Sequence, residues 1–229
     1  MADHLALDIE TVPAADMSEY SESIQEVLRQ KIEKQQERNP DFDFKYYAST
    51  HGDFGKVVCI SLGYISGDKI KLKSLCGHDE FKILDDFNRI IKTINGVFIH
   101  YNGLNFDIPF ILQRMAHHGI PPSNHRFKNL RKFSSDPHLD LMMQYYNWDY
   151  SRILKLGTLA EIHGVPSPKE DLSGDKVYEA YLNNEWERIA RYCEFDVATT
   201  LNLWNKLIRY EPMIGEENYE FSGVGASAD

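Results

Sequence analysis

The stretch His4-Leu-Ala-Leu-Asp-Ile-Glu10 decides how the fold begins. Apolar residues run together and end abruptly in two acidic ones, which is typical of a short buried strand with charge at its end. Because side chains alternate along a strand, Asp8 and Glu10 point to one face and Ile9 points to the other. Two carboxylates therefore converge, and such oxygen ligands suit hard cations such as Mg²⁺ and Mn²⁺.

The segments that follow predict a sheet with helices. Val57 to Ile65 is rich in β-formers, and Lys69 to Leu75 follows after a Ser66-Gly67-Asp68 turn, so we expect an antiparallel hairpin beside the first strand. Asp79 to Ile94 has apolar residues at helical spacing, and Val97 to His100 returns as a buried strand. Strand, helix and strand in this order predict the α/β class.

The chain beyond Ile108 is mainly helical in pattern. A long helix from about Glu185 to Tyr210 buries one apolar stripe and leaves neighbouring positions free to face a cleft. Shorter helices are expected at Pro109 to His118, near Leu141, near Leu159 and around Val177.

The length of 229 residues fits one domain, which we place at residues 1–221. Ser18 to Arg38 carries apolar residues at helical spacing among many charges, so we expect an exposed helix within a charged insertion at about residues 14–50. Residues 222–229 are small and polar, and we expect them to form a loose tail.

Composition and cysteine use narrow the class of protein. The hydrophobic fraction of 42% and the charged fraction of 26% are typical of globular proteins. Cys59, Cys76 and Cys193 are widely spaced and odd in number, which argues against a disulfide framework and a structural zinc site. The beginning of the chain does not resemble a signal peptide, and no apolar run is long enough for a membrane helix. We therefore expect a cytoplasmic protein without a membrane partner.

Two further segments carry candidate carboxylates. In His100-Tyr-Asn-Gly-Leu-Asn-Phe-Asp107, an apolar strand leads through a polar loop to a helix start, where Asp107 also suits a simple N-cap. In Tyr192-Cys-Glu-Phe-Asp196, a spacing of four places the phenol and the carboxylate on one helix face. That spacing alone is also common on ordinary helices.

Taken together, the Asp8-Ile-Glu-Thr11 motif, the Asn102-to-Asp107 motif and the Tyr192-to-Asp196 motif resemble the DEDD 3′-5′ exonucleases. The similarity is to the branch that contains the proofreading exonuclease domain of family B DNA polymerases, and it spans about Leu5 to Leu207. It implies a ribonuclease-H-like fold, in which helices flank a mixed sheet in a single domain. Tyr192 assigns the chain to the tyrosine version of the third motif, since Arg191 stands where the other version has His.

The resemblance also implies a site and a reaction. Asp8, Glu10, Asp107 and Asp196 would hold two divalent cations, Mg²⁺ or Mn²⁺, and Tyr192 would help to position the attacking water. The reaction would hydrolyse terminal phosphodiesters of single-stranded or frayed DNA to nucleoside 5′-monophosphates. Two cations stabilise the entering and leaving oxygens of such a displacement, which explains the need for four carboxylates.

Four residues near these motifs are candidates for substrate binding, and each also has an ordinary structural explanation. Phe106 could stack on the terminal base or belong to the core. Asn102 and Asn105 could bind the terminal sugar or phosphate, or form a turn. Thr11 could lie near the 3′ end or finish a turn. Asp140 and Lys169 stand where related domains have an Asp and a Lys, but we assign them no role.

The net charge of −10 argues against a protein that binds nucleic acid by electrostatics alone. Two divalent cations would reverse the field at the site. The segment from Ile108 to Ser135 contains no Asp or Glu, and its basic residues either seat phosphates or form a solvated surface. These are Arg114, Arg126, Lys128, Arg131 and Lys132.

Nucleic acid with a free 3′ end is the expected partner, with DNA favoured over RNA, and a replication or repair protein could recruit the enzyme. One alternative is a 3′-5′ exoribonuclease, because the motifs do not show whether the pocket accepts a 2′-hydroxyl. A second alternative is a non-catalytic module that binds nucleic acid or a replication protein with the same fold.

Overall fold

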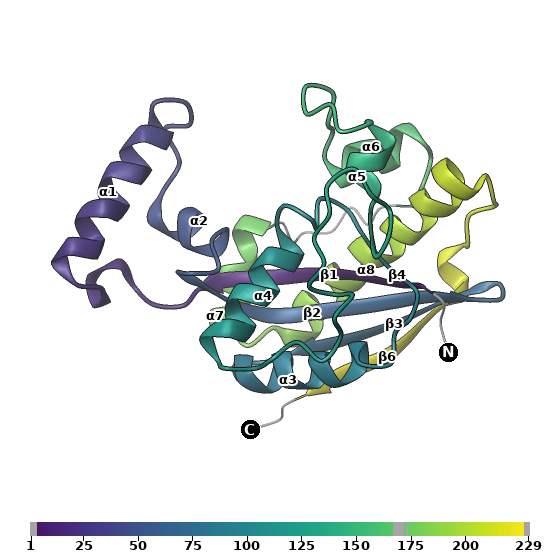
Figure 1. The fold of residues 1–229 in the computed structure, drawn as a ribbon, viewed down its shortest axis with the longest axis horizontal. Coiled ribbons are helices and arrows are strands. Elements are labelled where there is room, and N and C mark those ends of the chain that lie inside the picture. Colours follow the sequence, from purple (N-terminus) through teal and green to yellow (C-terminus); the bar gives the residue numbers. More distant parts are fainter. Residues whose placement is uncertain (1–3, 167–171, 173, 227–229) are drawn as a thin grey trace.

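The computed structural model describes residues 4–166, 172 and 174–226, and it has a six-stranded sheet as its centre (Figure 1). The strand order is β5-β4-β1-β2-β3-β6. The strands are β1 (His4–Pro13), β2 (Gly55–Ser66), β3 (Lys69–Cys76), β4 (Val97–His100), β5 (His138–Asp140) and β6 (Tyr219–Ala226).

The sheet is mixed, and its pairing confirms the predicted hairpin. Strand β1 pairs antiparallel with β2 and parallel with β4, so the strand that carries Asp8 and Glu10 lies inside the sheet. Strands β2 and β3 pair antiparallel across the predicted turn. The short edge strand β5 and the other edge strand β6, both parallel to their neighbours, were not predicted.

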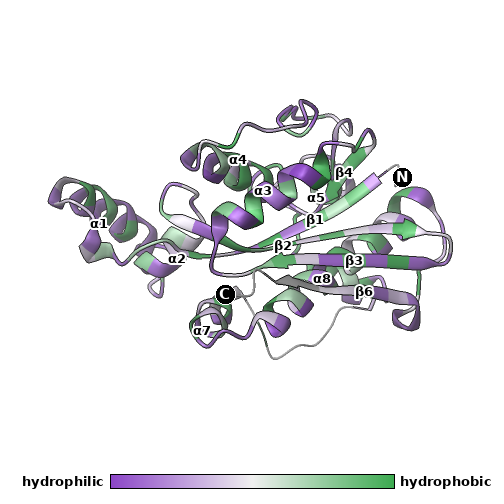
Figure 2. Cartoon of the chain, turned by 90° about the horizontal axis from the view of Figure 1, so that it is seen from below, coloured by the Kyte–Doolittle hydropathy of each residue, from purple (hydrophilic) through white to green (hydrophobic). Residues whose placement is uncertain are grey.

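Helices cover both faces of the sheet. Figure 2 shows α3 nearer the viewer and α8 behind the strands. The apolar alternation of β1 matches this arrangement, because Leu5, Leu7 and Ile9 pack with the α3 and α4 core while Ala6 packs with the α8 core. The helices are α1 (Glu22–Gln36), α2 (Phe44–Ser49), α3 (Glu80–Ile91), α4 (Asp107–His117), α5 (Leu141–Tyr145), α6 (Leu156–Ile162), α7 (Val177–Leu182) and α8 (Trp186–Trp204).

Short helical turns complete the chain. A π-helical turn at Asn205–Arg209 extends α8, so the predicted long helix ends close to Tyr210. Single 3₁₀ turns lie at Met17–Glu19, Gly174–Lys176 and Glu216–Asn218.

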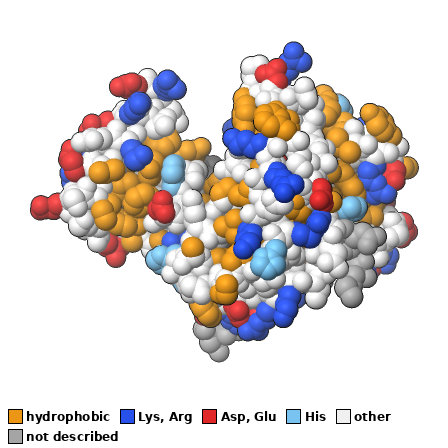
Figure 3. Space-filling view, in the orientation of Figure 1, with side chains coloured by type: hydrophobic (Ala, Val, Ile, Leu, Met, Phe, Trp, Pro, Cys, Tyr) orange, Lys and Arg blue, Asp and Glu red, His pale blue; other side chains and the backbone are white. Residues whose placement is uncertain are grey.

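The predicted insertion forms an arm that projects from the sheet (Figure 1). Helix α1 is as exposed as expected, since Leu28 and Ile32 are its buried side chains and Val27 is 50% exposed. Leu28 and Ile32 pack with Tyr47 of α2 in a small core of their own. In Figure 3 the surface is hollowed between this arm and the part of the molecule that contains α5 and α6.

Two expectations are wrong. Residues 222–226, predicted as part of a loose tail, belong to β6, and Val224, Gly225 and Ala226 pair with β3. Cys59 and Cys76, predicted not to form a disulfide, are disulfide-bonded. They lie directly opposite each other on β2 and β3, which linear spacing does not reveal. No helix among the described residues is long and apolar enough to cross a bilayer.

Candidate metal centre

Strand β1 places two carboxylates on the face that α8 covers. Leu7 and Ile9 belong to the opposite core, so Asp8 and Glu10 face α8, as strand alternation predicts. Helix α8 can approach closely because β2 has Gly63, where a Cβ would lie 2.6 Å from Val197 Cγ1. Glu10 is 8% exposed and Asp8 is half-buried.

Asp107 joins these carboxylates from the start of α4. The N-cap of α4 is Phe106, and Asp107 is the first residue of the helix, so it is not the cap that its sequence position also suggested. Its Oδ1 accepts a hydrogen bond of 3.1 Å from the Ile9 N–H, between Asp8 and Glu10. This bond ties Asp107 to the middle of β1.

Helix α8 brings the third motif to the same place. The Asp196 carboxylate interacts electrostatically with both Asp8 and Glu10, and so does the Tyr192 phenol. The structure therefore brings together all five residues that the motifs singled out.

Cys193 is a neighbour that sequence reasoning missed, because its place in the apolar stripe of α8 predicts only core packing. The buried Cys193 thiol donates a hydrogen bond to Asp8 Oδ2 at 3.4 Å. Ligand atoms of Asp8, Glu10 and Cys193 lie within 4.8 Å of one another. Its position beside Tyr192 on the helix was the available signal.

The carboxylates repel one another in a poorly solvated place. Burial raises the pKa of Asp8 and of Glu10 well above the usual range, and Asp107 and Asp196 raise both further. Burial also raises the pKa of Asp107 to about 7, against the opposing effect of His100. Within the described parts of the chain, no Lys or Arg forms an ion pair with Asp8, Glu10 or Asp107. The carboxylate oxygens of this cluster, with their excess negative charge, fit divalent cations.

The Tyr192 phenol is protonated at neutral pH. Burial raises its pKa above the usual range, and the carboxylates of Asp196 and Glu10 raise it further. A protonated phenol donates a hydrogen bond and does not act as a base. The structure therefore suits Tyr192 to orienting a water or a substrate oxygen.

The four candidate substrate contacts differ in their surroundings. Thr11 Oγ1 donates to the Ser49 carbonyl at 2.6 Å, which ties the end of α2 to β1. The Phe106 ring is partly buried and packs edge-on against Phe110 at 5.7 Å. Asn102 has a φ of 66°, and its Oδ1 accepts from Asn105 Nδ2 at 3.0 Å. Each therefore has a structural role.

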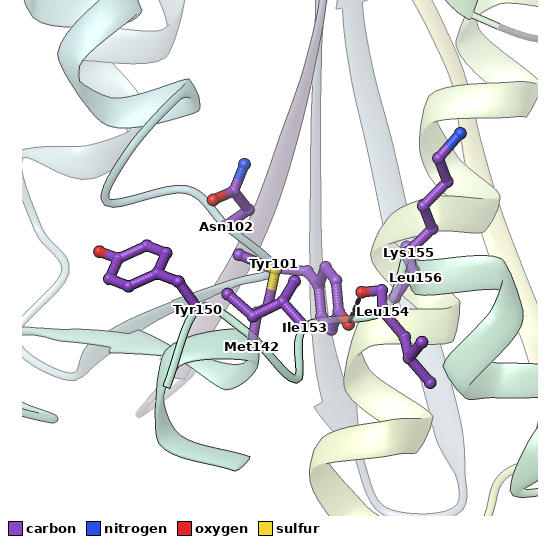
Figure 4. A pocket seen from close by; sticks show the side chains of 8 residues that line it. All are labelled: Tyr101, Asn102, Met142, Tyr150, Ile153, Leu154, Lys155 and Leu156. Carbon is purple, nitrogen blue, oxygen red and sulfur yellow. Dashed lines mark hydrogen bonds between the residues drawn. The ribbon is translucent and has the colours of Figure 1, made fainter. Parts of the chain in front are cut away.

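A pocket of about 590 Å³ opens beside the loop that leads to Asp107 (Figure 4). The Tyr101 hydroxyl donates to the Leu154 carbonyl at 2.6 Å and so fixes one wall. The surface of the pocket combines aromatic, aliphatic and amide groups with one ammonium group. The lining residues are Tyr101, Asn102, Met142, Tyr150, Ile153, Leu154, Lys155 and Leu156.

The basic segment does not act as one surface. Arg114 is buried and pairs with Glu80 at 2.8 Å, so it is not available to phosphates. Arg126 pairs with Asp136, while Lys128, Arg131 and Lys132 are exposed. Lys169 lies outside the described residues.

Comparison with known proteins identifies the family. The sequence model of the family described as "Predicted 3'-5' exonuclease related to the exonuclease domain of PolB" matches residues 47–224. The chain belongs to this family. The matched range of this PolB-related family includes Asp107, Tyr192 and Asp196 and begins after Asp8 and Glu10. No curated protein sequence matches the chain.

A solved structure supports the fold. The family B DNA polymerase from the hyperthermophilic archaeon Pyrobaculum calidifontis superposes with a TM-score of 0.58 at 21% identity. The match covers 92% of this chain and 25% of the polymerase, so the chain spans about a quarter of that protein's length. The predicted ribonuclease-H-like architecture, a mixed sheet flanked by helices, is confirmed.

Proposed function

We propose that the chain is a metal-dependent 3′-5′ exonuclease that acts on single-stranded or frayed DNA. The observation that carries this proposal is the convergence of Asp8, Glu10, Asp107 and Asp196 where no described Lys or Arg pairs with the first three. A buried cluster of carboxylates is unfavourable without counter-ions, so a cation site explains why it is built. Membership of a family of predicted exonucleases supports the same reaction.

Asp8, Glu10, Asp107 and Asp196 would hold two divalent cations, Mg²⁺ or Mn²⁺. When bound, the cations supply Lewis acidity for attack by water and charge stabilisation for the departing oxygen. The reaction breaks the last P–O3′ bond of the strand. Water adds its oxygen to the phosphorus, the leaving O3′ takes a proton, and a nucleoside 5′-monophosphate is released.

Protein groups orient this reaction. The protonated Tyr192 donates a hydrogen bond to the attacking water or to a phosphate oxygen, while Glu10 faces the same space. Asn102, Asn105, Phe106 and Thr11 surround the end of the strand. The pocket in Figure 4 extends from Asn102 and offers Tyr101 and Tyr150 to bases and Lys155 to a phosphate.

The test is degradation of a 5′-labelled single-stranded DNA oligonucleotide with Mg²⁺ or Mn²⁺, with a matched RNA in parallel. The proposal requires a ladder that shortens from the 3′ end, needs metal and disappears in Asp8→Ala and Asp196→Asn. Faster degradation of the RNA would instead establish the exoribonuclease alternative. No ladder on either strand would favour the binding-module alternative. The cytoplasmic location and the recruiting protein are separate predictions that this experiment does not test.

A further inference from the structure

The loop Tyr101–Phe106 connects β4 to α4 and determines where Asp107 lies. It turns tightly, with Asn102 in the left-handed region at a φ of 66°. It also folds back over His100, so closely that a Cβ added at Gly103 would lie 2.5 Å from the His100 Cγ. A loop in this conformation leaves backbone N–H groups without partners in regular structure.

Asp140 supplies those partners. Its Oδ1 accepts from the Asn102 N–H at 3.0 Å, and its Oδ2 accepts from the Leu104 N–H at 3.0 Å. Asp140 is fully buried at the end of β5, directly opposite His100 of β4 in the parallel register. The two bonds grip the loop three and five residues before Asp107.

We propose that Asp140 is a positioning residue of the metal centre. It holds the loop so that Asp107 reaches the Ile9 N–H and presents its carboxylate beside Asp8 and Glu10. The same bonds orient Asn102, which lines the pocket. The effect on catalysis rests on the proposed exonuclease function, whereas the effect on metal binding does not.

A purely structural role as a helix cap is separable from this one. Asp140 is also the N-cap of α5, through a bond of 3.2 Å from the Met143 N–H to Oδ1. Asn caps helices as well as Asp does, so Asp140→Asn retains the cap. Its amide nitrogen, however, cannot accept from Leu104 when its oxygen serves Met143. The substitution therefore loosens the loop.

The experiment compares Asp140→Asn with Asp79→Asn, a matched variant at the N-cap of α3, where Asp79 accepts from the Lys82 N–H at 3.0 Å. We expect Mn²⁺ binding, measured by calorimetry, to weaken about tenfold in Asp140→Asn only, which is the lower end of the loss typical when a group that orients a metal ligand is removed. We expect kcat to fall by about the same factor while the oligonucleotide KM stays within about twofold, and added Mn²⁺ to restore part of the activity.

The outcomes separate the two ideas. Equal Mn²⁺ affinity and kcat in wild type and Asp140→Asn would overturn the positioning role and leave the exonuclease proposal intact. An inactive wild type whose Mn²⁺ affinity still depends on Asp140 would overturn the exonuclease proposal and support the positioning role. If Asp140→Asn does not fold, hydrogen exchange of the wild-type protein decides. Slow exchange at the Asn102 and Leu104 amides supports the clamp, and exchange as fast as at exposed loops refutes it.

Discussion

Two buried acidic regions of the molecule are built on opposite principles. Glu80 is the first residue of α3, and it pairs with Arg114 of α4 at 2.8 Å and with His118, the C-cap of α4, at 2.7 Å. It also accepts from the Val57 N–H at 2.7 Å. Burial alone would raise the pKa of Glu80, but the hydrogen bonds from Arg114 and His118 hold it below the usual range. At the candidate metal centre the pKa of Asp8, Glu10 and Asp107 is raised.

The difference teaches how to distinguish a structural acid from a functional one. The chain balances Glu80 with its own cation and leaves no charge for a ligand to satisfy. At the centre the described residues add carboxylate to carboxylate, and in the proposed function divalent cations would supply the balancing positive charge. Perturbed pKa values of this second kind are typical of functional sites.

The largest expected difference is in activity. Asp8→Asn should lower the exonuclease rate roughly a thousandfold or more, because several kcal/mol of charge stabilisation is lost. The same variant should melt at a higher temperature than wild type in EDTA, since one repelling charge is gone. Rates and melting curves on one preparation check both parts. A fall in both activity and EDTA stability would mean that Asp8 is a structural acid like Glu80.

Removing the Arg114 cation that pairs with Glu80 should lower the free energy of unfolding and leave metal binding unchanged. Arg114→Met leaves Glu80 buried without its main partner, which typically costs about 3–5 kcal/mol. Urea denaturation measures this free energy of unfolding. The double variant Glu80→Gln/Arg114→Met is the control and should recover much of the loss. A loss equally large in the double variant would show that Arg114 acts through packing rather than through charge.

Metal should stabilise the folded protein through the carboxylates of the candidate metal centre and not through Glu80. Mn²⁺ at about a hundred times its dissociation constant adds about 2.7 kcal/mol, or roughly 5–10 °C in the melting temperature for a domain of this size. Asp8→Asn should lose most of this increase, and Glu80→Gln should keep all of it. An equal increase in the three proteins would place the metal elsewhere.

The smallest expected effect is an opposite response to pH in EDTA. The folded-state pKa of Asp107 is raised to about 7, so its contribution is fully favourable below its unfolded pKa near 3.8 and is lost as pH rises to about 7. The folded-state pKa of Glu80 is lowered from 4.5, so its contribution is present above that value and is lost as pH falls. Melting temperatures of Asp107→Asn and Glu80→Gln relative to wild type, from about pH 2.5 to pH 8, check these signs. Parallel profiles for both variants would contradict them.

The sequence predicts the core of the fold well, and it predicts which carboxylates lie together, where local pattern and long-range order agree. The alternation around Ile9 places Asp8 and Glu10 on one face, and the range Val97–His100 is found as predicted. Sequence reasoning missed β5 and β6, because a three-residue strand and a Gly-rich edge strand show little periodicity. It also missed the Arg114 pair and the Asp140 contacts, which depend on partners 34 to 38 positions away.

The central position of β1 has a consequence for the order of folding. Both neighbours of β1 in the sheet, β2 and β4, follow it in the chain, and the thiol that contacts Asp8 lies 185 positions away. Such distant pairings form late, because closing long loops costs entropy before any contact repays it. During synthesis the first two carboxylates therefore wait for α8, and a nascent chain has no assembled site until Asp196 of this helix has left the ribosome.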